Sequence, residues 1–156
     1  MGQHDILLRP GRTGDGVALY AVTAASVRGL AVKHYSPEQI DNWFGSRTEV
    51  WHENLLSSGQ TMVAEHNGRM VGFVHALPGE INRLFVLPEV SGKGLGTRLL
   101  QIGLQIASQN PIGPVEVVSL LNAVDFYKRH GFRILETGIY LPEVARGSEE
   151  LVRMER

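Results

Sequence analysis

The sequence predicts an α/β fold of the α+β type, in which helices flank a mixed, mostly antiparallel central sheet. The order of the hydrophobic patterns supports it: one strand, two or three helices, three consecutive strands, then helix, strand, helix and two strands. An Asn-Gly pair between two consecutive strands predicts an antiparallel hairpin. This order fits neither a doubly wound parallel sheet nor a barrel. With 156 residues, 43% of them hydrophobic, residues 1–156 are expected to form one domain with its own core.

The first elements are a strand and two helices. Residues 5–9 form a short apolar segment closed by proline and glycine, as expected of a strand. Asp15 is placed to cap a helix that runs to Leu30 with its apolar residues on one face. Ser36, followed by a proline and then by Gln39, forms a capping box that predicts the start of the second helix.

The middle of the chain predicts one short helix and three strands. The helix covers residues 49–56, and the strands cover residues 61–65, 70–76 and 80–87. The first two strands are joined at Asn67–Gly68, where both residue types tolerate a positive φ and therefore favour a hairpin turn.

The last third of the chain alternates helices and strands. A glycine-rich turn leads into a helix over residues 95–107, and residues 115–120 form an apolar strand expected to be buried on both faces. Asn122 is placed to cap the next helix, which ends at His130–Gly131. The remaining predicted segments are strands at residues 132–136 and 151–154 and a loop at residues 141–148.

The composition argues against several classes of protein. The net charge is −1 without a basic block, which argues against a nucleic-acid partner. The absence of cysteine excludes disulfides, thiolate metal sites and a cysteine nucleophile, and the six histidines show no closely spaced pair, so no metal is expected. No apolar run reaches the roughly 18 residues of a membrane span. We therefore expect a cytoplasmic protein without a membrane partner, and a homodimer only because dimers are the commonest oligomers.

The most informative segment is a glycine-rich turn between a predicted strand and a predicted helix. It carries Gly92, Gly94 and Gly96, with Lys93 between the first two. Glycines allow close approach of the backbone to a ligand, and the first N–H groups of a helix lack internal partners and carry partial positive charge. Such a turn can bind a phosphate group. It can equally be an ordinary glycine loop.

Two common phosphate-binding motifs do not fit this turn. A Walker loop places its lysine after the last glycine, whereas Lys93 lies between glycines. A dinucleotide fingerprint needs G-x-G-x-x-G, and Thr97 occupies the place of the last glycine. Glu116 stands about where a ribose-binding acid is expected, so a nicotinamide-dependent oxidoreductase stays open as a third alternative.

Two motifs together resemble the GNAT superfamily of acetyl-CoA-dependent N-acetyltransferases. The family pattern R/Q-x-x-G-x-G/A is similar to the segment from Ser91 to Gly96, and A-x-x-F-Y-x-x-x-G-F matches the segment from Ala123 to Phe132. Both occur in the family's order and spacing, and the segment 35–43 resembles one found in small bacterial members. Ser91 departs from the family's arginine or glutamine, and Leu120 stands where many members have an asparagine.

The resemblance implies a splay between the fourth and fifth strands and a binding site there for acetyl-CoA as acetyl donor. Main-chain N–H groups around Gly94 would hold the pyrophosphate, and the pantetheine arm would run along residues 84–86. An N–H of Phe85 or Val86 would stabilise the oxyanion. The donor-binding residues that the resemblance implies are Leu84, Phe85, Val86, Ser91, Gly92, Lys93, Gly94, Leu95, Gly96, Thr97 and Phe126.

The resemblance also implies two catalytic residues. Tyr127 is the family's candidate acid for the departing thiolate, although it can also be an amphipathic core residue. Glu80 is the candidate base, because it stands fourteen residues before Gly94, as a strand glutamate does in some members. Strand alternation would put Glu80 on one side with Asn82, Leu84 and Val86. Glu80 can equally be a solvated carboxylate at a strand end.

The acceptor is expected to be an amine of a small molecule or peptide. Tyr35 and Trp43 are expected to border its pocket, and Asn82 is a further substrate-binding candidate. His75 and Asn82 are second choices after Glu80 for the base, although His75 also fits a core position. Acidic residues on the nearby helices suit a cationic amine but are also typical of a solvated surface: they are Glu38, Asp41 and Glu53. The alternative function is a non-catalytic acyl-CoA-binding or regulatory module on the same fold.

Overall fold

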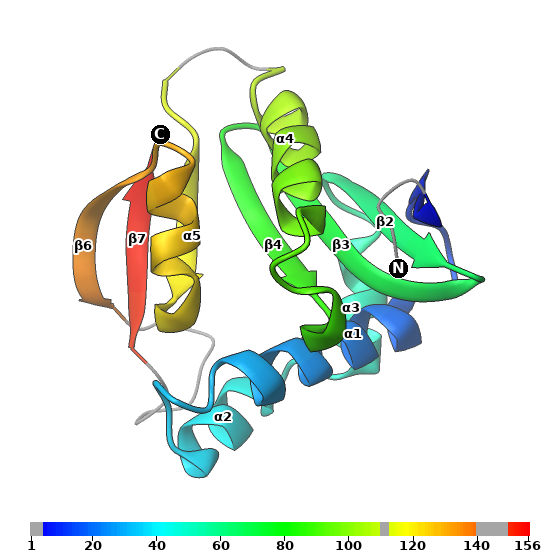
Figure 1. The fold of residues 1–156 in the computed structure, drawn as a ribbon, viewed down its shortest axis with the longest axis horizontal. Helices are drawn as coiled ribbons and strands as arrows, with labels where there is room; N and C mark the ends of the chain where they lie inside the picture. Colours follow the sequence, from blue (N-terminus) through cyan, green and yellow to red (C-terminus); the bar gives the residue numbers. More distant parts are fainter. Residues whose placement is uncertain (1–4, 110–112, 140–149) are drawn as a thin grey trace.

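The computed structural model describes residues 5–109, 113–139 and 150–156, and it shows a seven-stranded sheet with the strand order β1-β2-β3-β4-β5-β7-β6 (Figure 1). The strands are β1 Leu7–Pro10, β2 Gln60–His66, β3 Arg69–Leu77, β4 Glu80–Val86, β5 Glu116–Leu120, β6 Arg133–Ile139 and β7 Leu151–Glu155. The helices are α1 Gly16–Leu30, α2 Pro37–Phe44, α3 Glu49–Leu55, α4 Leu95–Ala107 and α5 Val124–Arg129, with 3-10 turns η2 Pro88–Val90 and η3 Leu121–Ala123. All pairings are antiparallel except that of β4 with β5, which confirms the predicted mixed, mostly antiparallel sheet.

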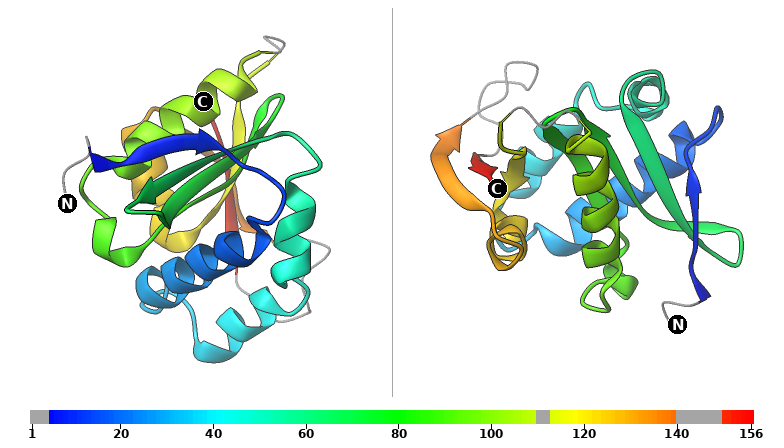
Figure 2. Two further views of the ribbon diagram at one scale, coloured as in Figure 1. Left: turned by 90° about the vertical axis from the view of Figure 1, so that its right-hand side faces the viewer. Right: turned by 90° about the horizontal axis from the view of Figure 1, so that it is seen from above.

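Helices cover both faces of this sheet (Figures 1 and 2). Helix α4 packs closely on β3 and β4 because Gly103 has no side chain: a Cβ there would lie 2.8 Å from Val74 Cγ2 and 2.9 Å from Ile81 Cδ1. On the opposite face, Phe85 of β4 contacts Trp43 of α2, with ring centroids 6.1 Å apart. We call these the α4 face and the α2 face. None of the helices in the described part of the chain has the length and hydrophobicity to cross a bilayer.

Local sequence signals fix several element ends as predicted. Ser36 Oγ accepts the backbone N–H of Gln39, and the Gln39 side chain accepts the N–H of Ser36, so the capping box of α2 is present. The hairpin turn between β2 and β3 has positive φ at Asn67 (52°) and Gly68 (78°), as its type requires. These ends depend on contacts between near neighbours in sequence, which explains why the sequence predicts them.

The predicted capping role of Asp15 is wrong, although α1 does begin directly after it. Its carboxylate accepts two hydrogen bonds of 2.9 Å from Arg9 and one of 2.8 Å from the Arg12 N–H. The start of α1 is instead bound by Glu53, which accepts the N–H of Gly16 at 2.8 Å. The Asp15 carboxylate is engaged by Arg9 and Arg12, so the Glu53 carboxylate takes its place at the start of α1.

The predicted cap at Asn122 is also wrong. The chain passes through η3 before α5 begins, and the residue that precedes α5 is Ala123, with no side-chain cap. The helix ends at His130 and Gly131 as predicted, with Gly131 at φ 89°. The loop predicted at residues 141–148 lies outside the described residues.

A β-bulge in β4 overturns the predicted alternation along this strand. In the ladder with β3, Ala76 pairs with Ile81 and His75 pairs with Arg83, so Asn82 is an extra residue in β4. Ile81 and Val86 therefore both reach the α4 face, although a strand with regular alternation would place them on opposite faces. Glu80 does not share a side with Leu84 and Val86 as expected, because the bulge reverses the alternation between them.

The parallel pairing of β4 with β5 is short, which confirms the predicted splay. The ladder joins Glu80 to Glu116 and Ile81 to Val117, at the start of both strands. Beyond the bulge the two strands diverge, with α4 and α5 on either side of the opening (Figure 1). The sheet is therefore open in its middle, where the backbone of β4 faces a gap rather than a neighbouring strand.

Candidate active site

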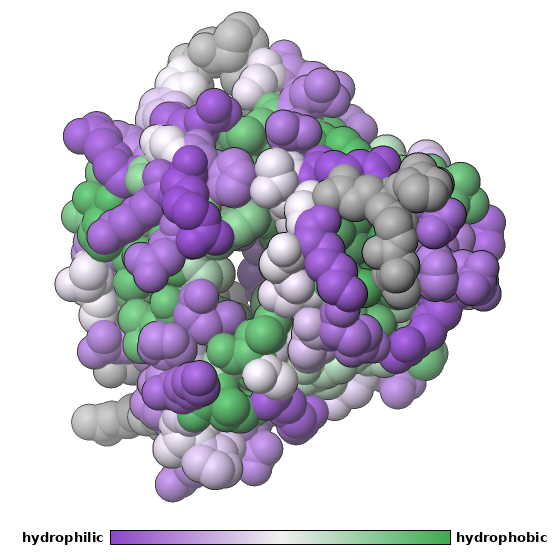
Figure 3. Space-filling model, in the orientation of Figure 1, coloured by the Kyte–Doolittle hydropathy of each residue, from purple (hydrophilic) through white to green (hydrophobic). Residues whose placement is uncertain are grey.

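A cleft of about 580 Å³ occupies the splay between β4 and β5. The molecular surface is hollowed between the part that carries α4 and the part that carries α5 (Figure 3). The lining includes Thr97 and Tyr127 from the α4 face and Trp43 and Arg47 from the α2 face, so the cleft passes through the sheet. Two reactants can therefore meet inside it from opposite faces.

Most of the predicted site residues line this cleft. Those that do are Trp43, Asn82, Leu84, Phe85, Val86, Ser91, Gly92, Gly94, Gly96, Thr97, Phe126 and Tyr127. Among the described residues, those predicted for the site but not part of its lining are Tyr35, Glu80, Lys93 and Leu95. Leu95 packs its side chain in the core with 1% exposure, so only its backbone can serve the cleft.

The glycine-rich turn places the start of α4 at the edge of the cleft. Gly92 and Gly94 have φ of 77° and 89°, which side chains with a Cβ rarely adopt. The first backbone bond of α4 runs from the Arg98 N–H to the Gly94 carbonyl, so the N–H groups of residues 95–97 lack acceptors within the helix. A Cβ on Gly96 would lie 3.4 Å from the Phe126 ring, which places α5 close against this turn.

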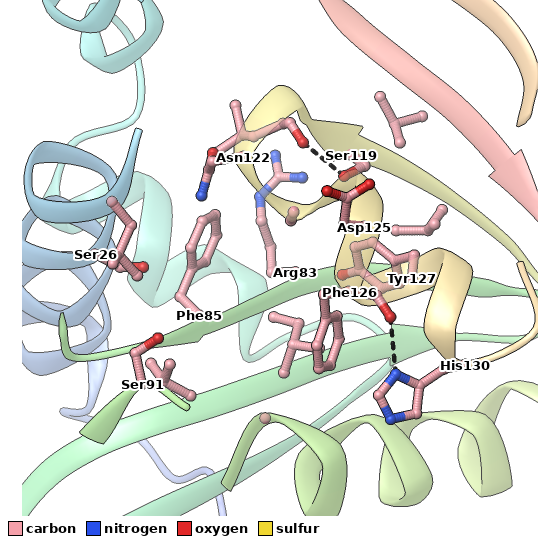
Figure 4. Close-up of a pocket in the computed structure, with 18 of the residues that line it drawn as sticks. Ser26, Arg83, Phe85, Ser91, Ser119, Asn122, Asp125, Phe126, Tyr127 and His130 are labelled. Carbon is pink, nitrogen blue, oxygen red and sulfur yellow. Dashed lines mark hydrogen bonds between the residues drawn. The ribbon is translucent and has the colours of Figure 1, made fainter. Parts of the chain in front are cut away.

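His130 ties α5 to the first turn of α4. Its Nδ1 lies 2.8 Å from the Phe126 carbonyl, which can only accept, so Nδ1 carries the proton (Figure 4). Its Nε2 then accepts from the Thr97 hydroxyl at 3.2 Å. The contact fixes the orientation of α5, and with it the position of the tyrosine in the second motif.

Tyr127 is a largely buried residue whose side chain reaches the cleft (Figure 4). Its ring packs between Phe126 and Phe132, at centroid distances of 5.2 and 5.3 Å. Burial raises the pKa of the phenol well above its usual value of 10, so the hydroxyl keeps its proton at neutral pH. The position of Tyr127 thus suits both roles predicted for it, core residue and candidate acid: its ring packs in the core, and its protonated hydroxyl is directed toward the splay.

Glu80 lies at the closed end of the splay, where β4 still pairs with β5. Burial raises the pKa of its carboxyl, Arg83 opposes this shift, and Glu116 adds to it. The Glu116 carboxylate accepts a 3.0 Å hydrogen bond from Arg153 and is not among the described residues that line the cleft. The ribose-binding role that a dinucleotide fingerprint would give Glu116 therefore has no support in this geometry.

His75 is a core residue rather than part of the site. It is fully buried, and neither ring nitrogen has a hydrogen-bond partner among the residues that the structure describes. Burial lowers the pKa of His75 from 6.5 to about 4, and the nearby Arg83 adds to the shift. The His75 imidazole is therefore neutral at pH 7. It does not line the cleft, so of the two interpretations of His75 from the sequence, the core position is the one that fits.

The lowered pKa of His75 predicts a pH-dependent stability. Because the unfolded chain binds the proton below pH 6.5 and the folded chain only below about pH 4, stability is complete above pH 6.5 and falls between these values. The shift corresponds to roughly 3 kcal/mol over that window. We expect His75→Gln to show a flatter dependence of unfolding free energy on pH, measured by urea titration from pH 7.5 to 4.0. Parallel curves for the two proteins would contradict this assignment.

The predicted acceptor residues divide between the cleft and the core. Trp43 lines the cleft, whereas the Tyr35 hydroxyl donates to the Glu150 carbonyl at 2.7 Å and accepts the Leu121 N–H at 2.8 Å. Tyr35 therefore links α2 to the C-terminal half of the sheet. The acidic residues proposed for a cationic amine do not line the cleft: Glu53 binds the start of α1, Asp41 lies 3.7 Å from Arg28, and Glu38 is exposed.

The sequence did not predict the two arginines on the α2 face of the cleft, Arg47 and Arg83. Arg83 directly precedes the apolar residues Leu84–Val86, and a charged residue next to such a run is a signal that could have indicated a special role. Arg47 lies in the loop between α2 and α3, where no pattern marks it. Their convergence depends on the bulge in β4 and on the path of that loop.

Comparison with known proteins identifies the class to which this fold and cleft belong. A family model described as "Acetyltransferase (GNAT) domain" matches residues 31–140, which is more than half of the chain. The chain therefore belongs to the GNAT superfamily of acetyltransferases. A curated relative, the "Uncharacterized N-acetyltransferase YafP" of Escherichia coli K12, is 32% identical over 133 residues that cover 85% of each chain.

Solved structures agree with this assignment. The chain superimposes on a GCN5-related N-acetyltransferase from Rhodopseudomonas palustris with a TM-score of 0.86 and 25% identity, covering 96% of this chain and 94% of the other. The PaiA N-acetyltransferase from Thermoplasma acidophilum, solved in complex with coenzyme A, gives a TM-score of 0.74 at 21% identity, covering 97% and 99%. The second likeness shows a shared fold.

Proposed function

We propose that this protein transfers the acetyl group of acetyl-CoA to a primary amine of a small molecule, peptide or protein by direct attack on the thioester. The observation that carries the proposal is the cleft that passes through the splayed sheet, with the open start of α4 at one end and Tyr127 inside it. Membership of the GNAT superfamily supports the reaction class.

The α4 face suits the diphosphate and arm of the donor. The unpaired N–H groups of Leu95, Gly96 and Thr97 at the start of α4 can bind phosphate oxygens, and the helix dipole adds partial positive charge. Lys93 in the preceding turn would add a full charge. The pantetheine arm would lie along Leu84–Val86, where β4 has no pairing with β5, and an N–H of Phe85 or Val86 would stabilise the oxyanion.

Tyr127 supplies the proton that the departing thiolate needs. The amine nitrogen forms a bond to the thioester carbon, the carbon–sulfur bond then breaks, and the phenol proton passes to sulfur; the phenolate that remains then regains a proton from solvent. The raised pKa of Tyr127 keeps this proton in place before the reaction at neutral and moderately alkaline pH. A thiol product and an acetylated amine result.

Glu80 is proposed to take up the proton that the amine must lose. It lies outside the cleft lining, so the proton would reach it through solvent, and its raised pKa makes it a better base than an ordinary carboxylate. In the wild type, we expect the plot of log kcat/KM against pH to become steeper at acid pH, below the pKa of Glu80. The Glu80→Gln variant should lack this added slope, and its kcat/KM should be at least tenfold lower at neutral pH. Glu49→Gln, at an exposed helix start, is the control. Superimposable profiles would remove Glu80 from the mechanism.

The proposed function is tested by donor binding and by turnover. Acetyl-CoA should raise the melting temperature, and an amine library should release free thiol in a colorimetric assay. Stabilisation by CoA without thiol release from any amine would favour a non-catalytic acyl-CoA-binding module. Stabilisation by NADH but not by CoA would contradict the proposal.

A further inference from the structure

Two arginines line the α2 face of the cleft, and both pack on the same tryptophan ring. Arg47 has 1% of its surface exposed, donates to the Trp43 carbonyl at 2.7 Å and stacks on the Trp43 ring at 4.5 Å. Arg83, the residue after the bulge in β4, stacks on the Trp51 ring at 4.9 Å, and Arg47 lies 5.7 Å from the same ring. Both guanidinium groups therefore lie within 6 Å of the Trp51 ring, both act on the nearby His52, and both line the cleft.

Among the described residues, this end of the cleft brings together two guanidinium groups and a buried histidine. The pKa of His52 is lowered by burial first and then by Arg83 and Arg47, so His52 stays neutral beside two permanent charges. Glu80 also feels Arg83, but it is not among the described residues that line the cleft. Among the described residues that line the cleft, Asp125 alone carries a carboxylate. It belongs to α5, which lies on the α4 face and not on the α2 face.

We propose that the acceptor is a small amine that also carries a carboxylate, and that Arg47 and Arg83 bind this carboxylate; this inference rests on the proposed function. Guanidinium groups match carboxylates in geometry and form strong charge-assisted hydrogen bonds, and stacking on tryptophan limits the entropy they lose. A cationic group of the acceptor would be repelled by the two guanidinium groups. It could not stack on Trp43 or Trp51 instead, because the guanidinium groups already pack on these rings.

The same charges favour the chemistry. An amine is mostly protonated at neutral pH, and only its neutral form can attack the thioester. Neighbouring positive charge lowers the pKa of an ammonium group and so increases the neutral fraction. An acceptor anchored through its carboxylate would therefore have its amine held near the splay and partly deprotonated by the same two arginines.

Matched acceptors test the inference. Each of a set of amino acids is compared with its own primary amide, and kcat/KM is measured from thiol release with acetyl-CoA. We expect the carboxylate member to be preferred by about 100-fold, and Arg83→Gln to reduce that preference to within about threefold, mainly through KM. Arg69→Gln, a surface arginine 3.3 Å from Glu89, is the matched control and should retain the full preference. Equal kcat/KM for both members in the wild type would overturn the inference while the proposed function stands.

A binding measurement keeps the inference falsifiable without turnover. The chain has two tryptophans, Trp43 and Trp51, and both contact the arginines, so their fluorescence reports on this end of the cleft. N-acetyl amino acids should change the fluorescence of the CoA-saturated protein, and their amides should not. Loss of this difference in Arg83→Gln, with an unchanged melting temperature, supports the inference. Equal binding of acid and amide, or faster acetylation of a peptide lysine than of any free amino acid, contradicts it.

Discussion

Replacing Tyr127 by phenylalanine is expected to lower kcat by about 100-fold or more and to leave acetyl-CoA affinity nearly unchanged. The substitution removes one oxygen and keeps the ring between Phe126 and Phe132, so the packing of α5 is preserved. Because burial raises the pKa of the Tyr127 phenol, its protonation does not change between pH 6 and 9. The loss in kcat should therefore be similar across that range.

A second tyrosine gives the control for this experiment. Tyr20 packs against Phe44 at a centroid distance of 5.8 Å and is not among the described residues that line the cleft. Tyr20→Phe should keep wild-type kcat, and calorimetric titration with CoA should give similar affinities for all three proteins. A Tyr127→Phe enzyme with normal kcat would show that the thiolate leaves without help from this phenol.

Replacing Gly94 by alanine is expected to weaken CoA binding by at least tenfold. Gly94 has φ of 89°, and it precedes the N–H groups that are proposed to hold the diphosphate. An L-residue at this φ costs about 1–3 kcal/mol of strain, and relief of that strain would move the first turn of α4. The amides would then no longer converge on one anion, so the loss should appear in the Kd measured by calorimetric titration.

A glycine of similar conformation outside the site separates this effect from general strain. Gly68 has φ of 78° in the hairpin between β2 and β3, and a Cβ there would meet no atom within 4 Å. Gly68→Ala should lower the melting temperature by an amount comparable to Gly94→Ala and leave CoA affinity intact. Equal CoA affinity in both variants would mean that the turn before α4 does not hold the donor.

The sequence predicts most of the fold because its signals are local. The capping box at Ser36, the hairpin at Asn67–Gly68 and the apolar face of α4 depend on residues within a few positions of one another. The glycine-rich turn is predictable for the same reason, since positive φ and an open helix start are properties of a short segment. Where a partner outside the helix competes, the local prediction fails: Asp15 pairs with Arg9 of β1 instead of capping α1.

The acceptor side of the site could not be predicted in this way. The orientation of Arg83 depends on the bulge at Asn82, which is a property of the register between β3 and β4 rather than of β4 alone. Arg47 reaches the same place from a loop, and Trp51 joins the two through stacking across three separate elements. Periodicity carries no information about such a convergence, because it joins segments that lie far apart in the sequence.

A crystal structure of this protein with CoA would show directly where the donor binds. We expect diphosphate oxygens within about 3 Å of the amide nitrogens of residues 95–97, a pantetheine arm between β4 and β5, and the sulfur beside the Tyr127 hydroxyl. A diphosphate bound elsewhere, or a sulfur on the far side of the splay from Tyr127, would contradict the proposed donor site.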